Sequence, residues 1–472
     1  MKRLFIAALS LMATGCGIYN RYERPDSVQV EADSLYRTEN APDTTSSLAS
    51  LKWEELFTDP YLQSLIRRGL EANTDLQTAV LRVEEAQATL RSSRLAYLPS
   101  VQLDPQGTLS SYDGSKTQKT YSLGGSASWE IDLFGKLTNA KRQSRAALLE
   151  SEAYRQAMQT QVIATVAESY YSLLMLDEQI RITGQTVESW REYVQSLQAL
   201  MKAGEADRAT LSQAEASRLS AEASLLSLQQ QVSEQENALC SFIGEASRNI
   251  ERGTLDEQQF PQEMSVGLPV ELLSRRPDVR QAEASLMQAF YATNSARSAF
   301  YPSITLSGSA GWTNSGGAAI ANPGAWLLQA VGSLVQPLFN RGQNIANLKI
   351  AKAQQQEALL NFKQSLLDAG QEVNNALTQW QTARERIRLE NEQVKHLETT
   401  VSDTRLLMKY GTINYLQVLT ARQSLLSAQL NLASDRYNEI QGVINLYHAL
   451  GDPYASRRSV RISFFREVKP VN

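Results

Sequence analysis

The sequence has very few of the residues from which catalytic and metal sites are usually built. It has 472 residues but only two histidines, His396 and His448, and two cysteines, Cys16 and Cys240. Both histidines fall in helical stretches without a metal-ligand neighbour, so we expect them to pack or to face solvent. Two cysteines exclude a disulfide framework, and Cys240 is expected to be a small packing residue. The sequence contains no nucleophile–base set, metal cluster or phosphate loop, so we expect neither enzyme activity nor a cofactor.

The chain also lacks a strong charge of one sign, and after its N-terminus it lacks long hydrophobic runs. Its net charge is −4, and no basic patch with interleaved aromatic residues occurs. This argues against nucleic-acid binding. No later stretch is apolar enough for a transmembrane helix, which needs about 20 such residues. Any crossing of a membrane is therefore expected to be by strands.

The N-terminus has the form of a signal peptide. Lys2 and Arg3 precede the apolar run 4–12, and Ala13-Thr14-Gly15 leads into Cys16. The run is too short for a membrane span, and residues 1–15 are expected to be removed. The Ala-Thr-Gly-Cys ending resembles a bacterial lipobox, which predicts a lipidated Cys16. An ordinary signal peptide with a chance cysteine is the alternative. Residues 16–50 are polar and are expected to form an extended tether.

The longest regular pattern is a heptad repeat in the C-terminal part of the chain, where no proline falls between Pro337 and Pro453. The apolar positions of this seam are Leu359, Phe362, Leu366, Ala369, Val373, Ala376, Trp380, Ala383 and Ile387. The spacing predicts knobs-into-holes packing in a helix of about 70 residues. A turn at Gly411 leads to a second seam, so residues 341–450 are expected to form a helical hairpin. A solvated coiled coil is the alternative interpretation of this segment.

Residues 100–132 have the alternation of a β-hairpin instead. One face of its second arm is apolar and the other is small and polar. The apolar positions are Tyr121, Leu123, Gly125, Ala127, Trp129 and Ile131. Arms of this kind are typical of membrane strands, which need about 9–11 residues, and Trp129 suits an interfacial aromatic belt. A soluble hairpin with one buried face is the alternative.

The two halves of the chain match each other. Residues 94–103 resemble 297–306, and the turn at Gly204 corresponds to the turn at Gly411, so the offset changes only from 203 to 207. We therefore predict a tandem duplication, in which each repeat has a short helix, a β-hairpin and a long helical hairpin. The predicted segments are the repeats 51–244 and 274–452, the β-hairpins 100–132 and 303–337, the helical hairpins 135–243 and 341–450, the junction 245–273 and the tail 453–472. Trp312 and Trp326, in the second β-hairpin, join Trp129 as candidate membrane-interface residues.

Four membrane strands cannot close a barrel by themselves, because about eight is the smallest number that does. Open sheet edges in lipid leave backbone groups unpaired, so several copies of the chain are expected to share one barrel. The amphipathic helices likewise need neighbours on both sides. A ring of such hairpins would enclose a hollow lined by polar, weakly charged side chains, which is the architecture of a conduit.

Several motifs resemble those of a known family. The string from Leu272 through Arg276-Pro277-Asp278-Val279 to Glu283 looks like the Arg-Arg-Pro-Asp-Val signature of the outer-membrane efflux lipoproteins. These are the TolC-like and OprM-like, NodT-type outer membrane factors. Tyr301-Pro302-Ser303-Ile304 is similar to a second family string. The N-terminal string Trp53, Phe57, Asp59-Pro60, Leu65-Ile66, Asn73 and Leu76 is similar to a third, so the resemblance covers nearly the whole chain.

The resemblance implies a fold of mixed α and membrane β structure. Each chain of a homotrimer would contribute four strands to a twelve-stranded outer-membrane barrel, continuous with a long periplasmic α-barrel and a mixed equatorial domain. It implies the exit duct of a tripartite pump that passively conducts drugs or other small molecules. The implied partners are outer-membrane lipid, a periplasmic adaptor protein and an inner-membrane transporter of the resistance-nodulation-division type.

The resemblance also assigns roles to the two helical turns. By matching position, the adaptor would meet the turns at Gly204 and Gly411. Family members often carry an acidic ring near the second turn, but here that turn contains no Asp or Glu. We therefore expect a gate of apolar and amide contacts at Thr412, Ile413 and Asn414, although these residues could equally serve only to form the turn.

Two other functions are compatible with the sequence. One is the exit duct of a type I protein or peptide secretion system, and the other is a lipid-anchored periplasmic coiled-coil spacer without a pore. The predicted lipidation and the Arg-Arg-Pro-Asp-Val string favour small-molecule efflux over secretion. The duplicated amphipathic hairpins argue against the spacer.

Overall fold

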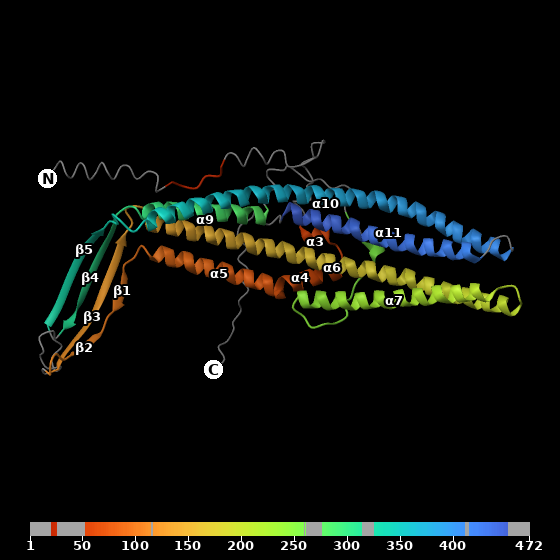
Figure 1. Ribbon diagram of the computed structural model, residues 1–472, viewed down its shortest axis with the longest axis horizontal. Helices are drawn as coiled ribbons and strands as arrows, with labels where there is room; N and C mark the ends of the chain where they lie inside the picture. Colours follow the sequence, from red (N-terminus) through yellow and green to blue (C-terminus); the bar gives the residue numbers. More distant parts are fainter. Residues whose placement is uncertain are drawn as a thin grey trace. The chain divides into compact units, whose positions relative to one another are not determined.

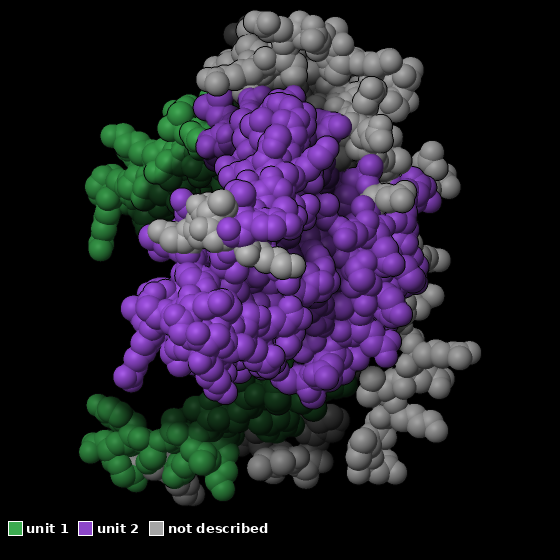
Figure 2. Space-filling view, turned by 90° about the vertical axis from the view of Figure 1, so that its right-hand side faces the viewer, with its two compact units in different colours: residues 1–28, 81–153, 280–365 green, residues 29–80, 154–279, 366–472 purple. Residues whose placement is uncertain are grey.

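The computed structural model describes residues 20–25, 52–114, 117–258, 260, 276–313, 325–410 and 415–451. Cys16, the turn 411–414, residues 259 and 261–273 of the predicted junction, and the predicted tail lie outside these residues. The chain divides into two compact units (Figure 2). Unit 1 comprises residues 1–28, 81–153 and 280–365, and unit 2 comprises residues 29–80, 154–279 and 366–472.

The elements follow the order that the periodicities predict (Figure 1). They are α3 (Trp53–Leu56), α4 (Pro60–Ala72), α5 (Thr74–Leu95), β1 (Ser100–Leu103), β2 (Gln106–Ser110), β3 (Gln118–Ile131), α6 (Lys136–Lys202), α7 (Arg208–Phe242), η4 (Leu255–Glu257), α9 (Pro277–Ser298), β4 (Ser303–Thr313), β5 (Ala325–Val335), α10 (Gln343–Lys409) and α11 (Tyr415–Leu450).

The strands of unit 1 form one antiparallel sheet in which β1 and β2 pair with β3, β3 with β4, and β4 with β5 (Figure 1). The two predicted hairpins are therefore joined through β3 and β4. These strands approach closely at Gly124 and Gly311, where a Cβ on Gly311 would lie 2.5 Å from the Cα of Gly124. Only a residue without a side chain fits this crossing.

The first arm of the predicted hairpin 100–132 consists of two strands, β1 and β2. The arm is interrupted at Asp104 and Pro105, which separate β1 from β2. Proline has no amide proton to donate to the ladder, and this breaks the strand without shifting its register. Leu103 lies opposite Gly125 before the break and Gln106 opposite Ser122 after it, so the residue numbers of both pairs add up to 228.

The long helices match their predicted lengths and seams. Both α6 and α10 have 67 residues, which corresponds to ~100 Å of helix. Their return helices, α7 and α11, have 35 and 36 residues. The heptad seam is confirmed by burial of Phe362, Leu366, Ala369, Val373, Ala376, Trp380 and Ala383. No helix in the described part of the chain is both long enough and apolar enough to cross a bilayer.

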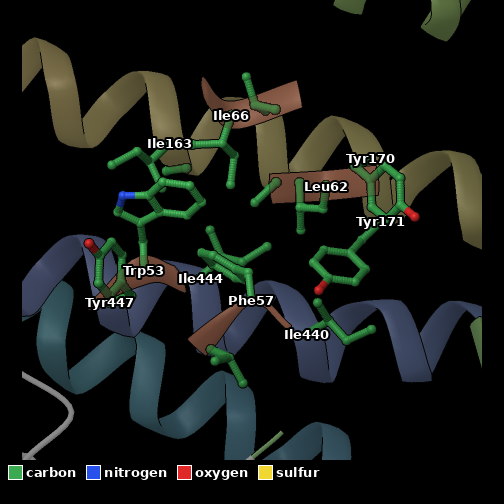
Figure 3. Close-up of a cluster of buried hydrophobic side chains, with 14 of the residues drawn as sticks. Trp53, Phe57, Leu62, Ile66, Ile163, Tyr170, Tyr171, Ile440, Ile444 and Tyr447 are labelled. Carbon is green, nitrogen blue, oxygen red and sulfur yellow. The ribbon is translucent and has the colours of Figure 1, made fainter. Parts of the chain in front are cut away.

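The main core of unit 2 surrounds α3 and α4. Phe57, Leu62 and Ile66 point into a cluster with side chains of α6 and α11 (Figure 3). The rings of Tyr170 and Tyr171 meet edge to face at 5.6 Å, an arrangement that stabilises aromatic pairs beyond their burial. The short helices α3 and α4 thus pack against α6 and α11 and hold them together at this level.

A buried carboxylate at the edge of this core starts α4. Asp59 is the N-cap, and its Oδ1 accepts the amide proton of Tyr61 at 2.9 Å, as the Asp59-Pro60 pair predicts. Its Oδ2 accepts protons from the hydroxyl of Tyr170 at 2.6 Å and from Nε2 of Gln258 at 3.0 Å. One side chain therefore connects α4, α6 and the loop after α7.

Candidate functional site

The sheet of unit 1 has one continuous apolar face. The register places Val101, Ala127, Gly308 and Ala330 in one cross-strand row. The next row contains Leu103, Gly125, Ala310 and Leu328. The outer side chains of these rows are uncovered in the described structure, since Val101 is 77% exposed and Leu328 is 84% exposed. A face of this kind requires an apolar environment, which another protein surface or lipid can provide.

The opposite face is polar and almost free of charge. One row runs through Gln102, Ser126, Ser309 and Gln329, and the neighbouring row contains Ser100, Ser128 and Ser307. These residues line a shallow cavity of about 400 Å³. The pattern is less regular in β5, where Val331 lies opposite Ser307 on this polar face. The apolar positions on both faces of that arm are visible in the sequence.

The three predicted interface tryptophans lie at two levels of the sheet. Trp312 is the register partner of Trp326, near the end of the β4–β5 hairpin. Trp129 pairs with Leu306 near the other end, and its Nε1 donates to the carbonyl oxygen of Tyr97 at 2.9 Å. Trp129 is 41% exposed. Separation of the aromatic residues along the strands fits belts at two interfaces, which stays a prediction.

The turn between α6 and α7 is built as its sequence indicates. Gly204 has a φ of +79°, a left-handed conformation that closes the end of α6, and open space surrounds it. Asp207 caps α7 by accepting the amide proton of Thr210 at 2.8 Å. That hydrogen bond lowers the pKa of Asp207. The corresponding turn, with Gly411, Thr412, Ile413 and Asn414, lies outside the described residues.

A contact between α6 and α11 was not predicted from the sequence. The guanidinium of Arg422 donates to the hydroxyl and the carbonyl oxygen of Ser189 at 2.8 and 3.0 Å. It lies over the rings of Trp190 and Tyr193, 5.5 and 5.1 Å from their centroids. Burial lowers the pKa of Arg422, and its buried Nε has no hydrogen-bond partner within the described structure. Tyr193 also contacts Met408, so α6 holds both helices of the second hairpin.

The Arg-Pro-Asp-Val segment lies at the start of α9, where Arg276 connects it to α10 and α11. Arg276 is 3% exposed and donates to the carbonyl oxygen of Ala449 at 2.7 Å. It also binds Asp278 through two nitrogens and Glu372 through one. Burial and the positive charge of Arg276 lower the pKa of the adjacent His448. In the described part of the chain no group of three metal-ligating side chains comes together.

Comparisons with known proteins point in one direction. The sequence model of the family described as "Outer membrane efflux protein" matches residues 65–245 and 268–452. The chain is 29% identical over 452 residues to the cation efflux system protein CusC of Escherichia coli O6:H1, covering 95% of this chain and 97% of CusC. It is 28% identical over 466 residues to the toluene efflux pump outer membrane protein TtgC of Pseudomonas putida, covering 95% of each chain.

Solved structures give the same result. The chain resembles a crystal structure of CusC with a TM-score of 0.81 at 27% identity, covering 92% of this chain and 99% of that one. It resembles the open-state MtrE outer membrane channel of Neisseria gonorrhoeae with a TM-score of 0.81 at 29% identity, covering 92% and 98%.

Proposed function

This chain belongs to the outer membrane efflux protein family and is an outer-membrane efflux channel protein; from that premise, we propose that it is the exit duct of a tripartite pump. The observation that supports the duct is the two-faced sheet. In the proposed homotrimer, each chain contributes four strand arms: β1 with β2, then β3, β4 and β5. The twelve arms close into one barrel, so no strand edge is left unpaired in the membrane. The apolar face meets lipid, and the row with Ser126 and Ser309 faces the lumen.

The helices make the proposed periplasmic continuation of this duct. A helical hairpin from each repeat supplies neighbours for the amphipathic seams, and solutes move passively inside. A periplasmic adaptor docks at the turns with Gly204 and Gly411, and the energy comes from an inner-membrane transporter of the resistance-nodulation-division type. Family membership favours this role over a type I secretion duct and over a spacer without a pore. Relatives named for cations and for toluene are compatible with substrates as diverse as drugs and other small molecules.

We propose that the closed duct is held in part by Arg422, in addition to Thr412, Ile413 and Asn414. Replacing Arg422 by alanine removes the contacts with Ser189 and both rings, so α11 is held less firmly against this part of α6. The single-channel conductance of the purified protein in planar bilayers is expected to be small and to rise severalfold in Arg422→Ala. Removal of the exposed charge in Arg388→Ala is the control and should change nothing.

Two outcomes of this measurement would count against the proposals. A bilayer that stays silent with every variant, including one with alanine at 412–414, contradicts the pore. A conductance that rises only in the 412–414 variant places the gate in the turn and not at Arg422.

Lipidation of Cys16 is proposed from the lipobox. Cys16→Ser removes the sulfur that accepts the lipid, so labelled palmitate should no longer enter the protein. Cys240→Ser serves as control, because that thiol is buried and should not be acylated. Label that remains in Cys16→Ser would refute the assignment.

Adaptor docking at the turns predicts a specific effect of bulky charge. Lysine at both Gly204 and Gly411 should weaken adaptor cross-linking and drug efflux. Trimers should stay intact, because open space surrounds Gly204 and the new side chain meets no neighbour there. The strain of a left-handed lysine is about 1–2 kcal/mol and confined to the turn. Gly184→Lys is the matched control, since Gly184 lies within α6 and also faces open space. Normal cross-linking and efflux in the double variant would remove the turns from the docking site.

A further inference from the structure

Charged side chains are rare on the sheet, and they differ in the face on which they lie and in whether an opposite charge pairs with them. The described strand residues and the break at 104–105 contain Asp104, Lys119 and Glu130. Lys119 lies opposite Leu109, on the same face as Tyr121 and Leu123. Glu130 lies on the polar face, but Nζ of Lys136 binds its carboxylate at 2.7 Å, so this pair adds no net charge there. Asp104 is the remaining charge.

Asp104 is held on the polar face by its neighbours in β3. Its amide donates to the carbonyl oxygen of Gly124 at 2.8 Å, which keeps the residue in the ladder. The hydroxyl of Ser126 donates to Oδ2 of Asp104 at 2.6 Å, and Ser126 belongs to the polar row with Gln102 and Ser309. Within the described structure no lysine or arginine pairs with this carboxylate. Its negative charge therefore remains uncompensated on a face of hydroxyls and amides.

We propose that Asp104 gives the membrane end of the duct a preference for cations over anions. This inference rests on the proposed trimeric duct, in which three copies of the carboxylate face one lumen. A fixed negative charge raises the local concentration of cations and lowers that of anions within about one Debye length. That length is ~10 Å at 0.1 M salt and ~3 Å at 1 M, so the preference should weaken strongly at high salt.

Pro105 follows Asp104 directly at the break between β1 and β2. A proline in the ladder replaces a backbone donor next to Asp104, while Ser126 fixes the side chain from the neighbouring strand. The carboxylate lies next to Ser126, which lines the cavity of the polar face together with Ser128 and Ser309. The ligands expected to concentrate there are small cations and solutes with an ammonium or other cationic group.

The test is the reversal potential of the full-length protein in planar bilayers under a potassium chloride gradient. Wild type should favour potassium over chloride at 0.1 M, and Asp104→Asn should lower the permeability ratio at least twofold. Asp104→Lys should shift the reversal potential toward that of chloride. The control is Glu130→Gln combined with Lys136→Gln, which removes a pair without net charge and should leave the ratio unchanged.

The outcomes separate this inference from the duct itself. Normal currents with an unchanged permeability ratio in both Asp104 variants contradict the role of Asp104 alone. An equal fall of the ratio in the double control also overturns it, because the effect would then not belong to the uncompensated charge. A wild-type protein that carries no current contradicts the proposed duct, and with it this inference.

Discussion

Replacing Arg276 by glutamine is expected to lower the free energy of unfolding by about 3–5 kcal/mol, the usual cost of removing one partner of a buried ion pair. Arg276 is almost completely buried and binds Asp278, Glu372 and the carbonyl oxygen of Ala449. Burial alone would lower the pKa of this guanidinium, but its hydrogen bonds and charge interactions with Asp278 and Glu372 together outweigh that effect and raise the pKa. The positive charge is therefore an integral part of the fold.

Glutamine cannot replace these contacts, because it offers two donors from one nitrogen while Arg276 uses three nitrogens. Lysine keeps the charge but not the fork that binds Asp278 from two nitrogens, so Arg276→Lys should recover only part of the loss. The stability of both variants can be measured in detergent by thermal unfolding, monitored by far-ultraviolet circular dichroism. Arg388→Gln is the control, since Arg388 pairs with Glu385 on an exposed helix surface. An Arg276→Gln protein that melts like wild type would show that α9, α10 and α11 hold together here without the guanidinium.

The helices could be predicted from the sequence because their code is local. The spacing of three and four from Phe362 to Ala383 specifies which side faces the core, and those positions are buried. The start of α4 at Asp59-Pro60 and the start of α7 at Asp207 follow from N-capping, which depends on a few neighbouring residues. The alternation of β3 likewise separates the polar face from the apolar one.

Contacts between distant segments could not be predicted in the same way. Nothing in the alternation says that Gly124 lies opposite Gly311, almost 190 residues later, since many registers satisfy a period of two. The contact of Arg422 with Ser189 depends on how α11 lies against α6, and an isolated arginine on a helix is usually solvated. The role of Arg276 as a junction required the positions of the start of α9, the middle of α10 and the end of α11, although the motif itself was visible.

Replacing Asp59 by alanine is expected to lower the free energy of unfolding by roughly 1.5–5 kcal/mol. The lost N-cap of α4 accounts for about 0.5–2 kcal/mol. The hydroxyl of Tyr170 and the amide of Gln258 lose their acceptor in a largely buried place, which adds about 1–3 kcal/mol. Burial, and then the hydrogen bond to Asp59, raise the pKa of Tyr170, so the tyrosine remains a donor that needs this partner.

Two further variants separate the cap from the buried network. Asp59→Asn keeps one acceptor oxygen, which can serve either Tyr61 or Tyr170 but not both. The stability of this variant should therefore lie between those of wild type and Asp59→Ala. Asp207→Ala removes the exposed cap of α7, which binds Thr210, and should destabilise less than Asp59→Ala. Circular dichroism reports the global loss, and hydrogen exchange of the first α4 amides reports the cap. Equal losses in Asp59→Ala and Asp207→Ala would mean that the contact between Asp59 and Tyr170 contributes nothing. A larger loss at Asp59, with faster exchange also at Gly253, whose amide donates to the Tyr170 hydroxyl, is the result that the buried network requires.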